Sequence, residues 1–341
     1  MRYLLPLMLI AIFIHFQAKA SVFYSLPSGK VIQILELDEA TKEIIDDSGY
    51  PFFNLLTKLD ISAQLRMKID SIDKKQAIEL LKREISGNVL KWDPAEIESI
   101  KKSMISIDSV LVLINNTILP DTLKFLKIEG KQYGVGMNYT VNNCIVLTQQ
   151  SVSHEDLLKI KGIIIHEIFH VFSRLSPGKR KQLYHSLGFQ PIDSLVPGDY
   201  LISRRLTNPD CQDCQYMFRL KNANGDTIPV TIINNTPSES IGSEHQSINF
   251  LSSGFYEIYE QEGICYVKDY KNIPQALDLK QYSGLRERIG RITNYLTNQE
   301  EITAMFFSKV VYNKLALGYL DKYSAEDRER LEQFEQLLRR L

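Results

Sequence analysis

Two amphipathic segments stand out in the N-terminal third of the chain. The stretches "DKKQAIELLKREI" (residues 73–85) and "DPAEIESIKKSMISI" (residues 93–107) carry apolar residues at three- and four-residue spacings, which predicts helices. Asp93 and Pro94 are typical cap and first-turn residues. We find no candidate chemistry in these segments. We expect residues 21–103 to form a mainly helical N-terminal region, and the sequence leaves open whether it is a domain, a cover over a cleft or a segment removed on maturation.

The pattern changes from about residue 104 onward. Short runs rich in Val, Ile and Leu, separated by turn residues, predict strands at "SVLVLIN" (109–115), "DTLKFLKIEG" (121–130) and "NCIVLTQQ" (143–150). Ser153 and Asp156 in "SVSHED" then form a capping-box pattern, so we expect a helix to start there and to run to about Ser173. Helices followed by a small sheet and a further helix indicate an α+β fold.

The predicted helix contains "KGIIIHEIFHVFSR" (161–174), which is apolar on nearly all sides and therefore typical of a buried, central helix. His166 and His170 lie four residues apart and project from one face. In an H-E-x-x-H motif two such imidazoles bind one zinc ion, and the intervening glutamate, here Glu167, is the general base. The alternative is that both are core histidines satisfied by neighbours, with Glu167 facing solvent.

A catalytic zinc needs a third protein ligand, and the sequence does not supply it nearby. The H-E-x-x-H-x-x-G-x-x-H spacing would require Gly and His where this chain has Ser173 and Ser176. The stretch "TNQEEITAMFFSKVVYNKL" (297–315) offers Glu300 and Glu301 at the start of an amphipathic helix. Either acid would complete a His, His, Glu set, although acids at a helix N-terminus are also stabilised by the macrodipole alone.

The charge of the chain indicates which classes of partner are unsupported, and its hydropathy indicates the cellular compartment. The 341 residues include 40 basic and 41 acidic ones, giving a net charge of −1 and no basic run, so nucleic-acid binding has no support. Residues 1–20 have an early Arg2, an apolar run and Ala18-Lys19-Ala20, which predicts a signal peptide cleaved near Ala20 rather than a short membrane anchor. No later segment is long enough to span a bilayer. We expect an exported protein, periplasmic or secreted.

The four cysteines are interpreted in that oxidising setting. We expect one or two disulfides, Cys211 with Cys214 or Cys144 with Cys265, rather than redox chemistry. A structural zinc site of four thiolates is not indicated, because the "CQDC" motif has no second C-x-x-C to complete it.

Three segments together resemble a family of bacterial zinc metallopeptidases of the gluzincin type. They are "IIIHEIFHVFSRLSPGKRKQLYHSLGFQPI" (163–192), "RRLTNPD" (204–210) and "RIGRITNYLTNQEEITAMFF" (288–307). The resemblance implies a zincin-like metallopeptidase domain over residues 104–341, with a small sheet and a central HExxH helix. It implies that His166 and His170 bind one Zn²⁺, that Glu167 is the base and that one of the paired acids is the third ligand, Glu301 being favoured over Glu300.

The sequence departs from the family pattern at two positions. Met305 stands four residues after Glu301, where an acid would support a zinc-binding histidine, and Gln299 stands where the family tends to have Pro. The missing acid leaves a histidine nitrogen to a different partner or weakens metal binding. For the oxyanion donor that a metallopeptidase needs, the candidates are Tyr139, His245, Tyr256 and Arg291. Tyr139 lies in "MNYTVNNCIVL", which the resemblance places as the edge strand beside an extended peptide.

At the end of the chain, Ser324 and Asp327 form a capping pattern for a final helix. Leu331, Phe334, Leu338 and Leu341 fall on one face of it. We expect this face to pack on the protein's own core in a monomer, with a homodimer contact as the alternative. Two functions remain, an exported metallopeptidase acting on peptides or proteins and an inactive peptidase-like fold that serves as a binding or structural module.

Overall fold

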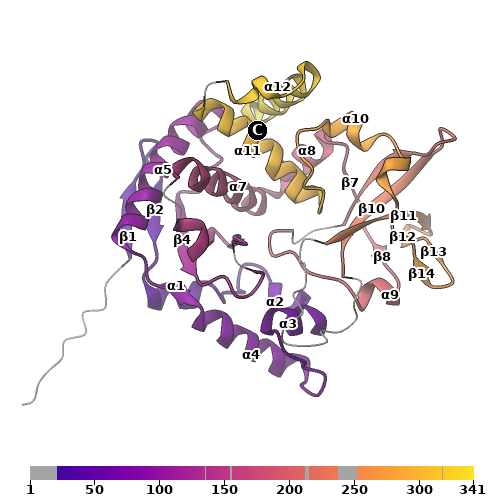
Figure 1. The fold of residues 1–341 in the computed structure, drawn as a ribbon, viewed down its shortest axis with the longest axis horizontal. Helices are drawn as coiled ribbons and strands as arrows, with labels where there is room; N and C mark the ends of the chain where they lie inside the picture. The colour runs from indigo at the N-terminus through magenta and orange to yellow at the C-terminus, as the bar shows by residue number, and fades with distance from the viewer. Residues whose placement is uncertain (1–20, 135, 154–155, 212–214, 237–251, 317) are drawn as a thin grey trace, which may run out of the picture.

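The computed structural model describes residues 21–134, 136–153, 156–211, 215–236, 252–316 and 318–341 (Figure 1). The fold is α+β, as the sequence predicted. The helices are α1 (Leu37–Glu43), α2 (Phe52–Leu55), α3 (Lys58–Leu65), α4 (Lys74–Gly87), α5 (Pro94–Ile114), α6 (Gln149–Val152), α7 (Leu157–Leu175), α8 (Pro177–Ser186), α9 (Asp199–Ile202), α10 (Leu285–Ile289), α11 (Gln299–Leu315) and α12 (Ala325–Arg340), with 3-10 helices η1 (Leu279–Gln281) and η2 (Tyr319–Lys322). The expected signal peptide lies outside the described residues.

Two larger sheets and one small one are present in the described residues. Their strands are β1 (Val22–Ser25), β2 (Val31–Ile34), β3 (Val89–Leu90), β4 (Thr122–Ile128), β5 (Tyr139–Val141), β6 (Cys144–Thr148), β7 (Gln190–Pro191), β8 (Leu195–Val196), β9 (Tyr216–Lys221), β10 (Thr227–Asn234), β11 (Ser253–Gln261), β12 (Ile264–Val267), β13 (Asp269–Tyr270) and β14 (Ile273–Pro274). The first sheet has the order β1-β2-β4-β6-β5, with β3 beside β4. The second has the order β7-β9-β10-β11-β12-β8, and β13 pairs with β14.

Helices cover both faces of the first sheet (Figure 1). Strands β2, β4 and β6 are parallel, and β5 runs antiparallel to β6 at the edge. Along β4, Leu123 and Phe125 pack into the core shared with α5 and α7, whereas Leu126 and Ile128 pack toward α1, α3 and α4. Burial on both faces explains why β4 and β6 appear in the sequence as nearly continuous apolar runs.

Residues 109–115 correct one prediction, because "SVLVLIN" is the last part of α5 rather than a strand. The side chains of Ile107, Val110, Leu111 and Ile114 are buried and follow the helical period, while Leu113 is 70% exposed. A short run of β-branched and leucine residues does not by itself distinguish a buried helix from a strand. The boundary expected between residues 103 and 104 falls inside this helix.

The N-terminal segment is built into the first sheet. Residues 21–103 contain the expected helix α4 and the first part of α5, with Asp73 and Asp93 as N-caps. They also contribute β1, β2 and β3, which the sequence did not predict. The start of α7 differs as well, since its N-cap is Asp156, whose carboxylate accepts from the Leu158 N–H, and Ser153 ends the preceding helix α6.

The last two helices close the large core. Helix α12 is capped by Ser324 as predicted, and Leu331, Phe334 and Leu338 on its apolar face are buried against the chain's own core. Phe334 contacts Phe306 of α11, with ring centroids 5.5 Å apart. The face considered for a homodimer contact is thus occupied within the chain. Among the residues that the structure describes, no helix combines the length and apolar character needed to cross a membrane.

The cysteines are only partly as expected. Cys144 on β6 and Cys265 on β12 are free thiols in different sheets, so the expected pairing between them is wrong. Cys211 is disulfide-bonded. Its expected partner, Cys214, lies outside the described residues.

Candidate metal centre

Two helices from distant parts of the sequence bring the candidate ligands together. Helix α7 carries His166, Glu167 and His170 in its buried middle, and α11 presents Glu300 and Glu301 in its first turn. The helices pack side by side at the centre of the molecule (Figure 1). Asn298 caps α11 by accepting a hydrogen bond from the Glu301 N–H at 2.9 Å, which fixes the start of the helix beside α7.

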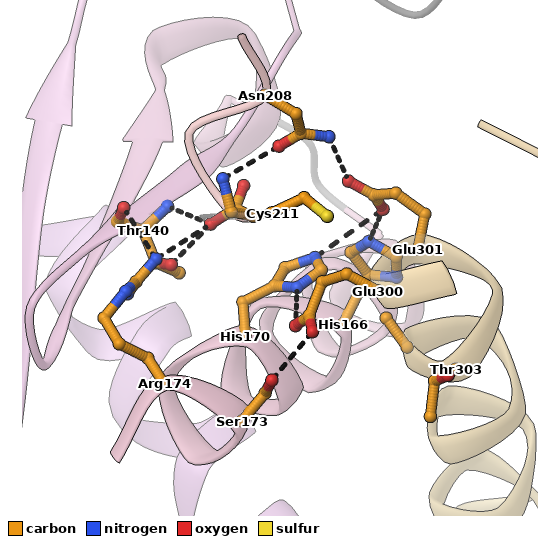
Figure 2. Close-up of polar contacts among 12 residues, drawn as sticks. Thr140, His166, His170, Ser173, Arg174, Asn208, Cys211, Glu300, Glu301 and Thr303 are labelled. Carbon is orange, nitrogen blue, oxygen red and sulfur yellow. Dashed lines mark hydrogen bonds and ion pairs between the residues drawn. The ribbon is translucent and has the colours of Figure 1, made fainter. Parts of the chain in front are cut away.

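Glu301 contacts both histidines of the motif (Figure 2). Its Oε2 lies 3.0 Å from His166 Nε2 and 3.6 Å from His170 Nε2. These three residues offer ligand atoms that all lie within 4.8 Å of one another. Ligand atoms that surround zinc tetrahedrally at about 2.1 Å are roughly 3.4 Å apart, so the spacing fits a zinc ion with little rearrangement. The sequence-predicted set of His166, His170 and Glu301 therefore converges.

Glu300 has a different position and a different role. Its carboxylate accepts a hydrogen bond from His170 Nδ1 at 2.7 Å and one from Ser173 Oγ at 2.7 Å, and it also accepts one from the Tyr184 hydroxyl. It thus holds the nitrogen of His170 that faces away from Glu301 (Figure 2). The sequence has Met305 at the position where an acid would support a zinc-binding histidine. In the structure Glu300, the residue before the candidate ligand Glu301, bonds with His170 Nδ1 instead.

The "TNPD" loop completes the surroundings of the cluster. Asn208 donates from Nδ2 to Glu301 Oε1 at 2.9 Å, so each oxygen of that carboxylate has a contact. Asp210 accepts from the Thr140 N–H at 2.9 Å, and its Oδ1 lies 3.5 Å from Arg174 Nη2. These roles were not predicted, because the loop was recognised only as part of a resemblance and a loop has no periodicity from which its side-chain directions follow.

Glu167 is buried next to this loop, near Asp210. Its side chain is 4% exposed, and Oε2 has no hydrogen-bond partner among the described residues. Burial and then the charge of Asp210 raise the pKa of Glu167 well above its ordinary value. Glu167, His170 and Asp210 also offer ligand atoms within 4.8 Å of one another. A buried carboxylate oxygen without a partner is costly unless a ligand or a reacting group approaches it.

The charges of the cluster shift the other pKa values in opposite directions. Burial opposes the charged form of His170, yet Asp210 and Glu301 together raise its pKa well above 6.5. Burial likewise opposes the charged form of Glu301, but the charge of His170 and the hydrogen bond with His166 lower its pKa. The opposite directions of these two shifts share one cause, the attraction between a positive imidazolium and a negative carboxylate.

A cleft of about 540 Å³ opens onto the cluster. Its lining includes all three candidate ligands, Glu167 and the aromatic side chain of Tyr295. Burial, followed by the negative charges of Glu301, Glu167 and Asp210, raises the pKa of Tyr295, so its phenol stays protonated beside the carboxylates. The Tyr295 N–H donates to Thr293 Oγ1 at 2.9 Å, which holds the loop before α11 in place. Sequence reasoning missed Tyr295, although it lies in "RIGRITNYL".

Of the predicted oxyanion donors, Tyr256 and Arg291 do not line the cleft, and the hydroxyl of Tyr139 is engaged elsewhere. Tyr139 lines the cleft, but its hydroxyl donates to Gln132 Oε1 at 2.8 Å. The Tyr256 hydroxyl bonds with Asn235 in the second sheet, and the backbone of Arg291 bonds with Asp327. His245 lies outside the described residues.

Strand β5 is the edge strand predicted beside the site, but its outer edge is already occupied. The Thr140 N–H donates to the carboxylate of Asp210. The carbonyl of Thr140 accepts from Arg174 Nη2 at 3.4 Å (Figure 2). Arg174 also donates to the carbonyl of Asn142 at 3.0 Å. An extended peptide could pair with Thr140 only by displacing these side chains.

The donor set, two imidazoles and a carboxylate, is one that zinc prefers, and the buried carboxyl group of Glu167 lies next to it. The arrangement is suited to holding a metal ion and to moving a proton at Glu167. Comparisons with protein-family models, with curated proteins and with solved structures found no match to this chain.

Proposed function

We propose that the chain is an exported, zinc-dependent metallopeptidase that hydrolyses peptide bonds of peptides or unfolded proteins, with a zincin-like catalytic domain over residues 104–341. One observation carries this proposal. His166, His170 and Glu301 converge in the lining of a cleft, beside Glu167, a buried carboxylate with one oxygen that has no hydrogen-bond partner among the described residues. Two neutral-nitrogen ligands, one carboxylate and an adjacent base are the parts that zinc peptidases use.

A zinc ion held by these residues would supply a Lewis acid that polarises the scissile carbonyl and acidifies a water molecule. Glu167 takes a proton from the attacking water and passes it to the leaving amine. Its raised pKa suits this exchange, because a base must also release the proton in the same turnover. Asp210, fixed by Thr140 and Arg174, keeps Glu167 in a negative field and so supports proton uptake.

Tyr295 is the donor that we assign to the carbonyl oxygen of the substrate. It lines the cleft, keeps its proton at neutral pH and is near enough to Glu301 and Glu167 for their charges to act on it. A phenol that lines the site can strengthen its hydrogen bond to the substrate as negative charge develops on the carbonyl oxygen. Glu300 and Asn208 act through the ligands, since they orient His170 and Glu301.

The test combines metal content with turnover. We expect about one zinc per chain by elemental analysis of purified protein. Glu167→Gln should keep that zinc and lose peptide hydrolysis by roughly 10²–10⁴-fold, because the amide cannot take the proton. The matched control is Glu332→Gln, which makes the same change on the exposed side of α12.

Two outcomes would contradict the proposal. Full activity of Glu167→Gln would remove the base from the mechanism. Zinc binding without turnover of any peptide, in wild type and variant alike, would instead favour the alternative, an inactive peptidase-like fold that binds partners.

A further inference from the structure

The cleft continues away from the metal cluster along the groove between α7 and α11. The two helices run in opposite directions: Glu300 meets His170 at the start of α11, and farther along, Tyr312 meets the other end of α7. The Tyr312 hydroxyl donates to the carbonyl of Leu158 at 3.4 Å, and its ring lies 3.7 Å from the position of a Cβ added to Gly162. Residues of both helices therefore line a path that leads outward from the cluster.

Charge is distributed unevenly along this path. Among the described residues, the acids that line the cleft are Glu167, Asp210 and Glu301, and all three offer ligand atoms at the candidate metal centre. The opposite end is lined by two lysines and two phenols, contributed by α7, α11 and η2: Lys159, Lys309, Tyr312 and Tyr319. A cleft with acids at the candidate metal centre and cations at the far end has a defined polarity for a substrate.

The far end is a built cationic and aromatic surface. Lys309 Nζ lies 5.8 Å from the ring centroid of Tyr319, and Lys322 Nζ lies 4.0 Å from the same ring on the outer side. Burial opposes ionisation of Tyr319, but the hydrogen bond from Lys309 and the charges of both lysines lower its pKa. Within the described ranges, no carboxylate forms an ion pair with Lys159 or Lys309.

An acid close to this end, Asp156, is already engaged. Asp156 influences Tyr312, but its carboxylate accepts from the Leu158 N–H at 2.9 Å as the N-cap of α7. The ammonium of Lys309 is thus held half-buried beside an aromatic wall, where a charge-assisted hydrogen bond is stronger than on the open surface.

We propose that the end of the cleft formed by Lys159, Lys309, Tyr312 and Tyr319 binds a carboxylate of the substrate. This inference rests on the proposed function, because it names the class of peptide that the metal site cleaves. Lys309 follows Glu301 by eight residues, or about 12 Å along α11. An extended peptide advances about 3.3 Å per residue, so the carboxylate lies about four residues from the scissile bond. It belongs either to an acidic side chain or to the C-terminus of the substrate.

The experiment uses a neutral fluorogenic peptide with a single Glu placed in turn at positions one to five on either side of the cleavage site. Each peptide has a Gln counterpart, and each is made with a free and an amidated C-terminus. We expect the zinc-loaded protein to cleave one Glu peptide, about four residues out, roughly tenfold faster in kcat/KM than its Gln counterpart. A preference that depends only on the free C-terminus would assign the carboxylate to the chain end.

Substitution of the lysine links the preference to the site. In Lys309→Met the ratio of kcat/KM between the preferred acidic peptide and its neutral counterpart should fall toward one, and Lys159→Met should reduce it in part. Lys161→Met, which removes a lysine of α7 that does not line the cleft, should keep the ratio of the wild type. An unchanged ratio in Lys309→Met, or no preference in the wild type, would overturn the inference while leaving peptide hydrolysis intact.

Measurements of peptide binding test the proposed carboxylate subsite independently of peptide hydrolysis. The same labelled peptides are titrated onto zinc-loaded Glu167→Gln by fluorescence anisotropy, with Lys309→Met introduced as a second change. Tighter binding of the acidic peptide that depends on Lys309, without turnover by the wild type, would keep the subsite and refute the peptidase. Equal binding of acidic and neutral peptides would refute the subsite.

Discussion

Adjacent glutamates at the start of α11 have separate tasks. Glu301 faces the nitrogens of both motif histidines, whereas Glu300 holds the opposite nitrogen of His170 together with Ser173 and Tyr184. Helical geometry makes this division feasible, because successive residues point about 100° apart and can approach α7 from two sides. Glu301 is placed as a candidate ligand, and Glu300 orients the candidate ligand His170.

This division predicts different effects on metal affinity. Glu300→Gln removes the charge that orients His170, so zinc affinity should fall about 10–100-fold while one zinc still binds at saturation. Glu301→Gln should abolish stoichiometric binding at the same zinc concentration. Both are measured by competition with a chromophoric chelator, with Ser173→Ala as a variant that removes only one donor to Glu300. Equal affinity of Glu300→Gln and wild type would show that His170 needs no acidic partner.

The role proposed for Tyr295 predicts how its substitution changes kcat and KM. Tyr295→Phe removes the hydroxyl and keeps the ring, so kcat should fall about 10²–10³-fold with KM and zinc content little changed. Steady-state kinetics on one peptide check this, and Tyr270→Phe on the exposed β13 strand is the control. A rise in KM at constant kcat would mean that the phenol binds substrate without acting on the reacting carbonyl.

The sequence predicted those site residues that a helix places by periodicity. His166 and His170 share a face because they are four residues apart, and the apolar flanks of Glu167 implied burial. Glu301 required a resemblance to a known family, since nothing in local periodicity brings α11 to α7. The contacts of Asn208, Asp210 and Tyr295 come from loops, whose side-chain directions depend on tertiary structure.

At the scale of elements, helix α3 supports the "TNPD" loop from the N-terminal part of the chain. Asp60 is fully buried and accepts hydrogen bonds from the Thr207 N–H at 2.8 Å and from Thr207 Oγ1 at 2.9 Å. It also caps its own helix by accepting from the Thr57 N–H at 2.8 Å. The next loop residue, Asn208, bonds with Glu301, so the N-terminal segment contributes to the geometry of the candidate metal centre.

Asp60→Ala should therefore impair both stability and activity. It leaves several buried donors without an acceptor, which costs roughly 1–3 kcal/mol each, so the free energy of unfolding should fall by about 3 kcal/mol. The kcat/KM for peptides should fall as the loop loses its support. Urea denaturation and peptide kinetics measure the two effects, with Asp70→Ala on the exposed surface as the control. A destabilised protein with normal zinc affinity and kinetics would show that α3 and the loop are not coupled to the site.

Periodicity predicted the long elements and failed for short ones. The helices α4, α5, α7 and α12 were found because each presents several turns of a consistent apolar face. The end of α5 was assigned to a strand because its last two turns are rich in Val, Leu and Ile. Strands β1, β2 and β3 have two to four residues each, too few for alternation to be seen in the sequence.

At the scale of the whole molecule, the candidate metal centre joins parts of the core that the sequence separates by more than a hundred residues. Helix α7 contacts the first sheet through β5 and β6, and α11 contacts α12 and α5. A metal that ties α7 to α11 thus acts on the packing of the entire large core. Its binding energy should appear in global unfolding rather than in a local transition.

Zinc should accordingly raise the unfolding temperature. At a free zinc concentration a thousandfold above Kd, the linkage contributes about 4 kcal/mol. The rise in unfolding temperature caused by zinc should be larger at pH 8 than at pH 6, for two reasons. The raised pKa of His170 means that its paired, charged form stabilises the metal-free protein at low pH and that this contribution is lost as the pH rises through the folded-state pKa. Protons also compete with zinc for the imidazoles at low pH.

Scanning calorimetry with and without a chelator measures this difference. Glu301→Gln is the matched variant, because it removes a ligand while changing a single atom type. A zinc effect of equal size in that variant would place the stabilising metal elsewhere on the protein.

The occupied outer edge of β5 has a consequence for how the protein behaves in concentrated solution. Exposed backbone N–H and C=O groups at the end of a sheet recruit strands from other molecules, and proteins that leave them open tend to aggregate. Here Asp210 and Arg174 bond with Thr140 at that edge. The charges of these two side chains also act on Glu167, and their hydrogen bonds keep strands of other molecules from pairing with β5. Variants at Asp210 or Arg174 should therefore precipitate more readily as well as lose activity.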